Sequence, residues 1–122
     1  MNTPVSFEIA KLLKEKGFDD YSDKKYIAQC LWQNPNSREK YKNSEIHKNS
    51  SDVVAPTISE VVMWLYEKHG IWISVTLKRH SENKHFAYTI RQANGIETYL
   101  WGHNSPTEAY EAAIEYTLKN LI

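Results

Sequence analysis

The chain has 122 residues, of which 41% are apolar and 12% aromatic, so it is about one domain in size and can bury a sizeable core. Its 15 basic and 15 acidic side chains cancel to a formal charge of zero, which excludes a strong attraction of the whole chain to nucleic acid or to anionic membranes. Cys30 is the only cysteine, which excludes an intramolecular disulfide and a cysteine-rich zinc knuckle and fits a reducing compartment.

The N-terminal sequence MNTPVSFEIAKLLKEK contains Glu8 and three lysines where a secretory signal needs an unbroken apolar core. No stretch of the sequence approaches the ~20 consecutive apolar residues of a membrane span. We therefore expect a cytoplasmic protein with no membrane partner, folded as a single domain over residues 1–122.

The first two predicted elements are a helix and a strand. Thr3 followed by Pro4 is typical of a helix start, an apolar stripe follows, and Gly17 is predicted to end the helix. Alternating apolar residues over 26–32 predict one strand, in which Cys30 is expected to be a buried structural residue rather than a nucleophile.

Residues 34–54 are rich in Asn, Ser and Lys and contain little apolar material for a packed element. We expect a long, mobile loop here. Because structureless loops of this length are uncommon inside compact domains, the loop is either functional or hides an element that the pattern does not reveal.

The second half of the chain carries the clearest signals. Thr57 and Glu60 have the spacing of a capping box, and the helix that they begin is predicted to end at Gly70. Strict alternation from Ile71 onward predicts a strand, and a second strand follows the turn at RHSENKH.

A third strand and a last helix complete the predicted elements. The dipeptide Asn94-Gly95 predicts a type I′ hairpin turn into the strand IETYLW, because both central positions of that turn need positive φ. Ser105, Pro106 and Glu108 predict the start of a helix that runs to the end of the chain. The fold class is therefore α+β, in the order α-β-α-β-β-β-α, with an antiparallel sheet of three to four strands and helices packed mainly on one face.

Two resemblances accompany this pattern. The stretches APTISEVVMWLYEKHGIWISV and SPTEAYEAAIEYTLKNLI, with the hairpin between them, resemble a family of small uncharacterised proteins of anaerobic gut bacteria and their phages or mobile elements. In that family an Ala-Pro-Thr segment leads into a helix with a Trp-Leu pair, here Trp64-Leu65. The resemblance is loose in residues 20–54; it implies an architecture and a phage or mobile-element origin, and no activity.

The second resemblance concerns topology alone. Residues 57–122 run α-β-β-β-α, which is similar to the order in double-stranded RNA-binding domains. Those domains place lysines at the start of the last helix, where this chain has Glu108, Glu111 and Glu115. Because carboxylates repel the phosphate backbone, we interpret this similarity as a shared packing solution.

One face of the predicted meander is a candidate binding face. It lies opposite the aliphatic face and combines aromatic rings with two cations: Trp72, Thr76, Lys78, Arg91, Tyr99 and Trp101. If the face is open, it suits a protein hot spot or stacked single-stranded bases. Alternatively, the first helix, the long loop or a second copy of the chain covers it, since large exposed apolar patches are rare on monomers.

A second candidate is a basic loop made of Arg38, Lys40, Lys42 and Lys48. Four cations spread along a loop could contact phosphates, but a solvated surface is the better explanation in the absence of a recognition motif.

The sequence contains no catalytic motif, so we expect no enzyme activity, no metal and no cofactor. The leading hypothesis is a non-catalytic binding or accessory module that acts through a protein partner or as a homodimer. The alternative is a nucleic-acid-binding regulator that uses the basic loop together with the aromatic face.

Overall fold

The computed structural model describes residues 3–33, 40–46, 52–80 and 83–122. It is an α+β structure with two antiparallel three-stranded sheets, as the α+β prediction required. The elements in chain order are α1 (Phe7–Glu15), β1 (Lys25–Ile27), β2 (Cys30–Trp32), the short 3₁₀ helix η1 (Asn43–Glu45), β3 (Val53–Val54), α2 (Ile58–His69), β4 (Trp72–His80), β5 (Asn83–Arg91), β6 (Glu97–His103) and α3 (Pro106–Asn120).

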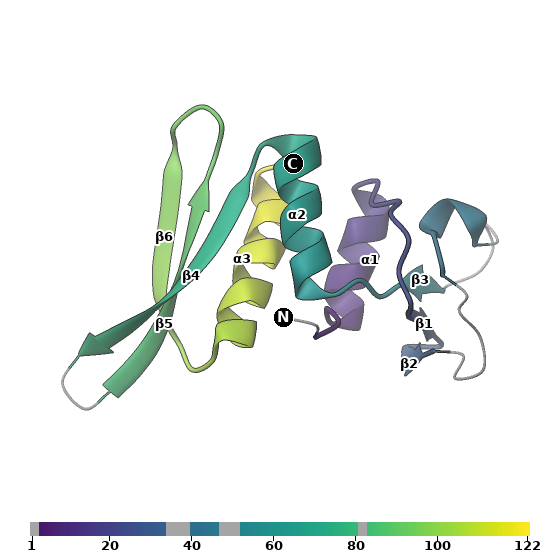
Figure 1. The fold of residues 1–122 in the computed structure, drawn as a ribbon, viewed down its shortest axis with the longest axis horizontal. Helices are drawn as coiled ribbons and strands as arrows, with labels where there is room; N and C mark the ends of the chain where they lie inside the picture. Colours follow the sequence, from purple (N-terminus) through teal and green to yellow (C-terminus); the bar gives the residue numbers. More distant parts are fainter. Residues whose placement is uncertain (1–2, 34–39, 47–51, 81–82) are drawn as a thin grey trace.

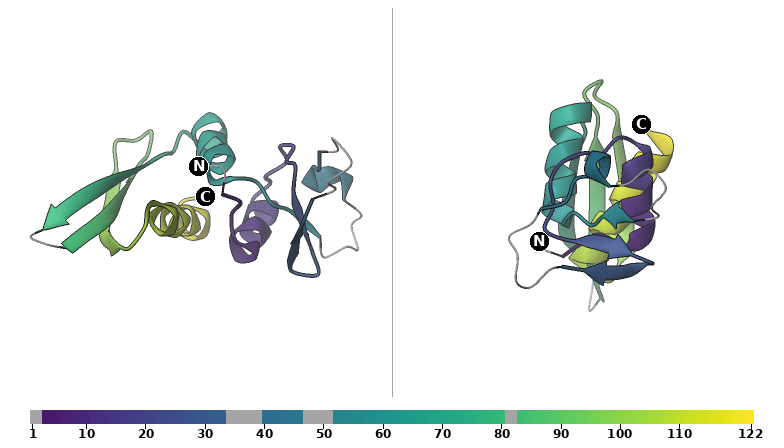
Figure 2. Two further views of the ribbon diagram at one scale, coloured as in Figure 1. Left: turned by 60° about the horizontal axis from the view of Figure 1, so that its bottom comes forward. Right: turned by 90° about the vertical axis from the view of Figure 1, so that its right-hand side faces the viewer.

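The elements form successive layers along the long axis of the molecule (Figure 1). The larger sheet, with strand order β4-β5-β6, lies at one end and carries α2 and α3 on one face. Helix α1 lies on the other side of these two helices, and the small sheet, with order β2-β1-β3, lies beyond it (Figure 2). The α2–α3 layer therefore has a packing partner on both sides.

The first helix begins later than the sequence suggests. Ser6, and not Thr3, is its N-cap, and the Ser6 hydroxyl accepts a hydrogen bond from the Ile9 N–H at 3.3 Å. The residues before it run alongside the start of α2, where Val5 N–H donates to the Pro56 carbonyl at 2.9 Å. The predicted end is confirmed, because Phe18 N–H donates to the Leu13 carbonyl at 2.9 Å in a Schellman closure around Gly17.

The single strand predicted over residues 26–32 is wrong. Strands β1 and β2 form a tight antiparallel hairpin instead, with Ile27 paired to Cys30. Ala28 and Gln29 have φ of 49° and 67°, and two successive positive φ values are what a type I′ turn requires. Neither residue type signals such a turn, so the pattern concealed it. Cys30 is exposed, which also corrects the expectation of a buried cysteine.

The described parts of the predicted loop 34–54 contain packed structure. Val53 and Val54 are buried and pair with β1 as β3. Asn43 links the segment just after α1 to β3. Its side-chain amide donates to the Phe18 carbonyl at 2.8 Å, and its side-chain oxygen accepts from Val54 N–H at 3.1 Å. The expectation of a stretch without packed elements is therefore wrong for residues 40–46 and 52–54.

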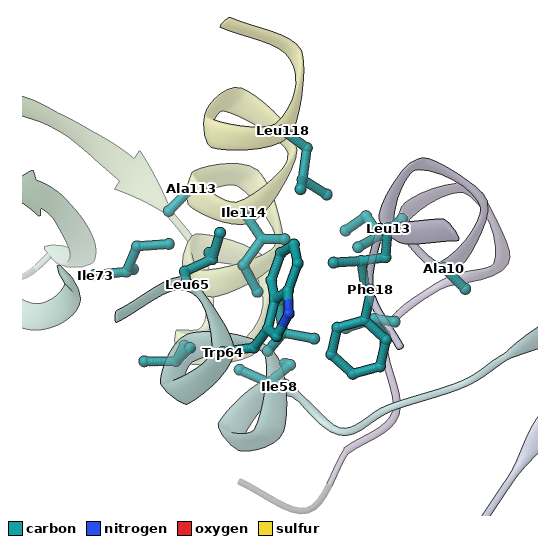
Figure 3. Packing of buried hydrophobic residues seen from close by; sticks show 14 of the residues in the cluster. Ala10, Leu13, Phe18, Ile58, Trp64, Leu65, Ile73, Ala113, Ile114 and Leu118 are labelled. Carbon is teal, nitrogen blue, oxygen red and sulfur yellow. The ribbon is translucent and has the colours of Figure 1, made fainter. Parts of the chain in front are cut away.

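Helix α2 begins and ends as predicted. Thr57 and Glu60 form both hydrogen bonds of the capping box, and Gly70 ends the helix at φ 64°. Its apolar side chains reach both neighbouring layers (Figure 3). Leu65 lies near Ile73 of the larger sheet, whereas the Trp64 ring packs edge-on against Phe18, with 5.3 Å between ring centroids.

The turn between β5 and β6 has a different type from the predicted one. Only Gly95 of the Asn94-Gly95 pair has positive φ, at 87°. Gly95 N–H donates to the Gln92 carbonyl and Gln92 N–H donates to the Ile96 carbonyl, both at 3.0 Å. This pattern is a turn followed by a glycine bulge, which joins the same two strands through a three-residue loop.

We expect Leu65→Ala to destabilise the fold by about 2–5 kcal/mol, because it leaves a cavity in the α2 layer at a fully buried position. Met63→Ala is the matched control on the same helix, since Met63 is 45% exposed. Urea unfolding followed by circular dichroism measures both free energies of unfolding. Equal losses in the two variants would contradict the described core.

A half-buried carboxyl group, that of Glu111, joins α3 to the N-cap of α1. The Ser6 N–H donates to the Glu111 carboxylate at 3.1 Å. Burial raises the pKa of Glu111 above its ordinary value, the Ser6 hydrogen bond lowers it in part, and Glu115 raises it further. Folding therefore favours the protonated form of Glu111.

Glu111→Gln is expected to raise the stability slightly at pH 7. The folded chain binds the Glu111 proton more tightly than the unfolded chain, so native stability falls as the pH rises through this pKa. The neutral amide does not titrate, and its advantage should disappear in acid, below the unfolded-state pKa of about 4.5. Thermal unfolding at several pH values measures the difference in stability between Glu111→Gln and the native chain. Glu67→Gln, at an exposed position, is the control. A stability difference that does not change with pH would contradict the raised pKa of Glu111.

Candidate functional site

The register of the larger sheet determines which side chains share its outer face, the face that points away from α2 and α3. Three cross-strand rows lie on this face: Trp72–Arg91–Glu97, Ser74–Thr89–Tyr99 and Thr76–Ala87–Trp101. Large rings stand on the outer strands, and small side chains occupy the middle of the second and third rows. The outer face therefore has aromatic rings along its borders and small side chains between them.

The aromatic rings of the outer face are substantially exposed. Trp72, Tyr99 and Trp101 are 40%, 52% and 54% exposed. Trp101 packs edge-on against His85, and Trp72 packs edge-on against Tyr66 of α2, each with 5.6 Å between ring centroids. These contacts hold the two indoles in place while leaving area on both accessible to a partner.

The charge on the outer face is largely compensated. Arg91 Nε lies 3.0 Å from the Glu97 carboxylate, and both side chains are more than half exposed. Thr76 is also exposed. Lys78 pairs with His85 in the β4–β5 ladder, although its side chain is not among those that the structure describes. The described part of the face offers rings and paired charges, and no strong positive field.

No described element of the chain covers the outer face. Helices α2 and α3 occupy the opposite face of the sheet, and α1 packs on the far side of these helices (Figures 1 and 2). The alternative in which the first helix covers the aromatic rings is thus wrong. The structure brings the predicted residues Trp72, Thr76, Arg91, Tyr99 and Trp101 together on one open surface.

The basic loop is only partly described, because Arg38 and Lys48 lie outside the described residues. Lys40 is exposed, whereas Lys42 is half-buried, lies 3.8 Å from the Asp19 carboxylate and stands 5.2 Å from the centroid of the Tyr21 ring. This region lies beside the small sheet, at the opposite end of the molecule from β4–β6 (Figure 1). The described lysines and the aromatic rings therefore do not form one surface.

Sequence reasoning missed two features that shape the outer face. Tyr66 of α2 is exposed and lies against Trp72, a contact that the apolar pattern of the helix does not reveal. At the far end of β6, Gly102 has φ 107° and interrupts the pairing with β5 between Phe86 and Ala87. A glycine within a strand pattern is a typical bulge signal, so the second feature could have been found.

Among the described residues there is no cluster of three or more His, Cys, Asp or Glu side chains that could hold a metal ion. No helix in the described ranges is long and apolar enough to cross a membrane. The chain matches no family model, no curated protein and no solved structure in the comparisons made. The candidate site therefore has to be interpreted from its own geometry.

Collisional quenching of tryptophan fluorescence tests whether the outer face is open. Acrylamide should reach Trp72 and Trp101, whereas Trp64, which is 4% exposed, should be protected. Replacing both outer-face indoles in Trp72→Phe/Trp101→Phe should lower the quenchable fraction of the emission at low protein concentration. Trp64→Phe is the control and should raise that fraction. A double variant whose quenchable fraction rises instead would show that the outer face is covered.

Proposed function

We propose that the chain is a non-catalytic binding module that makes protein–protein contacts through the outer face. The observation that carries this proposal is the exposure of Trp72, Tyr99 and Trp101 beside Arg91 on a sheet face that no described element covers. Tyrosine, tryptophan and arginine are the residues most enriched at the energetic centres of protein interfaces. The resemblance to phage or mobile-element proteins supports an accessory role.

The geometry favours a protein partner over nucleic acid. Single-stranded nucleic acids bind where aromatic rings lie beside an excess of positive charge. Here Glu97 neutralises Arg91 at 3.0 Å, and the described lysines of the basic loop lie at the other end of the molecule. The formal charge of the whole chain is zero. A protein surface requires no such excess.

The free energy gained by burying the three rings is close to the free energy that association costs. Each half-exposed ring can remove on the order of 100 Å² from water, which contributes about 2.5 kcal/mol at ~25 cal/mol per Å². Three rings together supply roughly 7.5 kcal/mol, within the ~4–15 kcal/mol that association costs. A tight contact therefore needs hydrogen bonds or further burial beside the rings.

The test is the double substitution Trp72→Ala/Trp101→Ala. Because it removes both indoles of the outer face, we expect it to weaken self-association or partner capture at least tenfold while the chain stays folded. Solution mass as a function of concentration, capture by immobilised chain and thermal unfolding are measured together. Trp32→Ala is the matched control, since Trp32 is 40% exposed at the other end of the molecule.

Two outcomes would overturn the proposal. One is a double variant whose mass, capture and stability all equal those of the native chain. The other is binding of the native chain to oligonucleotides that depends on Trp101 and falls steeply with added salt, which would indicate the nucleic-acid function instead.

A further inference from the structure

The outer face ends at a free strand edge. Strand order β4-β5-β6 leaves one side of β6 without a partner among the described strands. The hydrogen bond from Gln92 N–H to the Ile96 carbonyl makes that pair a hydrogen-bonded one. Because such pairs alternate along an antiparallel ladder, Thr98 and Leu100 turn their backbone groups toward β5. The same alternation turns the N–H and C=O groups of Glu97, Tyr99 and Trp101 outward.

This edge lacks the features with which proteins usually protect exposed strands. Edge strands are typically protected by lysine, by proline or by inward-pointing charges. Between Ile96 and Trp101 the only charge is Glu97, and there is no proline. Apolar side chains are exposed on both sides of the strand, since Leu100 on the helix side is 50% exposed and Tyr99 and Trp101 lie on the outer face.

The opposite edge of the same sheet differs. Strand β4 carries Lys78 and Arg79 in succession toward its end. Two adjacent cations on an edge strand repel a second copy of the same strand and disfavour pairing. The contrast between the two edges identifies β6 as the one available for pairing.

We propose that two copies of this chain associate by antiparallel pairing of their β6 edges, which joins the two larger sheets into one continuous sheet. The proposal rests on the proposed function and names its partner as a second copy. Pairing centred on Tyr99 places Tyr99 opposite the second copy's Tyr99 and Glu97 opposite the second copy's Trp101. In this register every outward backbone group of the three residues meets an outward group of the other copy.

The side chains agree with this register. The two Tyr99 rings become neighbours on the outer face, and Leu100 of each copy comes to lie opposite Thr98 of the other. The two Glu97 carboxylates stand about four residues apart along the strands, roughly 14 Å, which exceeds the ~8–10 Å over which exposed charges interact at physiological salt. A chain with zero formal charge adds no overall repulsion.

Strand pairing also supplies what the rings lack. It brings Tyr99 and Trp101, the two exposed rings of β6, to the junction between the copies, while Trp72 on β4 stays outside it. It also adds backbone hydrogen bonds along Glu97, Tyr99 and Trp101. A two-fold arrangement needs a single self-complementary edge, and two-fold dimers are by far the commonest protein oligomers.

A pair of substitutions at Tyr99 isolates the backbone contribution. Tyr99→Ala and Tyr99→Pro both remove the ring, but only proline removes the outward N–H, and that N–H makes no bond to β5. We expect proline to raise the dissociation constant of the dimer at least tenfold above that of the alanine variant, since two hydrogen bonds are lost per dimer. Sedimentation equilibrium measures both, with circular dichroism confirming that each variant is folded.

Cross-linking tests the register without relying on the proline variant. In a Cys30→Ser background, Tyr99→Cys places two thiols opposite each other with Cα atoms about 5.5 Å apart, within the range of a disulfide. Oxidised glutathione should therefore convert this variant to a covalent dimer. Glu97→Cys is the control and should stay uncross-linked, because its partner thiol lies roughly 14 Å away.

The outcomes separate this inference from the proposed function. A native chain that stays monomeric at high concentration, or equal cross-linking at positions 97 and 99, overturns edge pairing. Loss of partner capture in Trp72→Ala from a chain that remains monomeric supports the outer face as a binding surface and rejects the second copy. Capture of another protein that Tyr99→Pro abolishes would identify a foreign strand as the occupant of the edge.

Discussion

The whole arrangement depends on one constraint, which is that the α2–α3 layer is apolar on two sides. A helix with a single apolar stripe needs one packing partner, and the apolar face of β4 and β5 already provides that partner. Trp64 extends the apolar surface of α2 to the opposite side, where Phe18 closes over it (Figure 3). Because α1 packs on that second side, it does not cover the sheet, and no described element lies over the outer face.

The sequence predicted best where the local signal and the tertiary contacts agree. The capping box at Thr57, the glycine stop at Gly70 and the alternation of β4 all follow from short-range rules, and each is confirmed. The turn at Asn94-Gly95 shows the limit of such rules. The dipeptide correctly located a hairpin, but the turn that joins the two strands is of another type.

The N-terminal region was less predictable for physical reasons. Ala28 and Gln29 adopt left-handed conformations that their side chains do not favour, so the β1–β2 hairpin must be stabilised by its surroundings. The two-residue strand β3 is too short to produce a periodic signal. Side-chain bonds such as those of Asn43 connect segments far apart in the chain, and no local pattern encodes them. The composition of the candidate face was predictable from alternation, whereas its exposure depended on where α1 packs.

The contact between the segment that precedes α1 and the start of α2 has a consequence for the order of assembly. Val5 and Pro56 are joined by a backbone hydrogen bond, so this contact closes a loop of about fifty residues. The β5–β6 hairpin closes over three residues and is far less costly in chain entropy. The meander and its two helices can therefore form first, and α1 with the small sheet docks onto a preformed surface. Until that step is complete, the indole of Trp64 faces water.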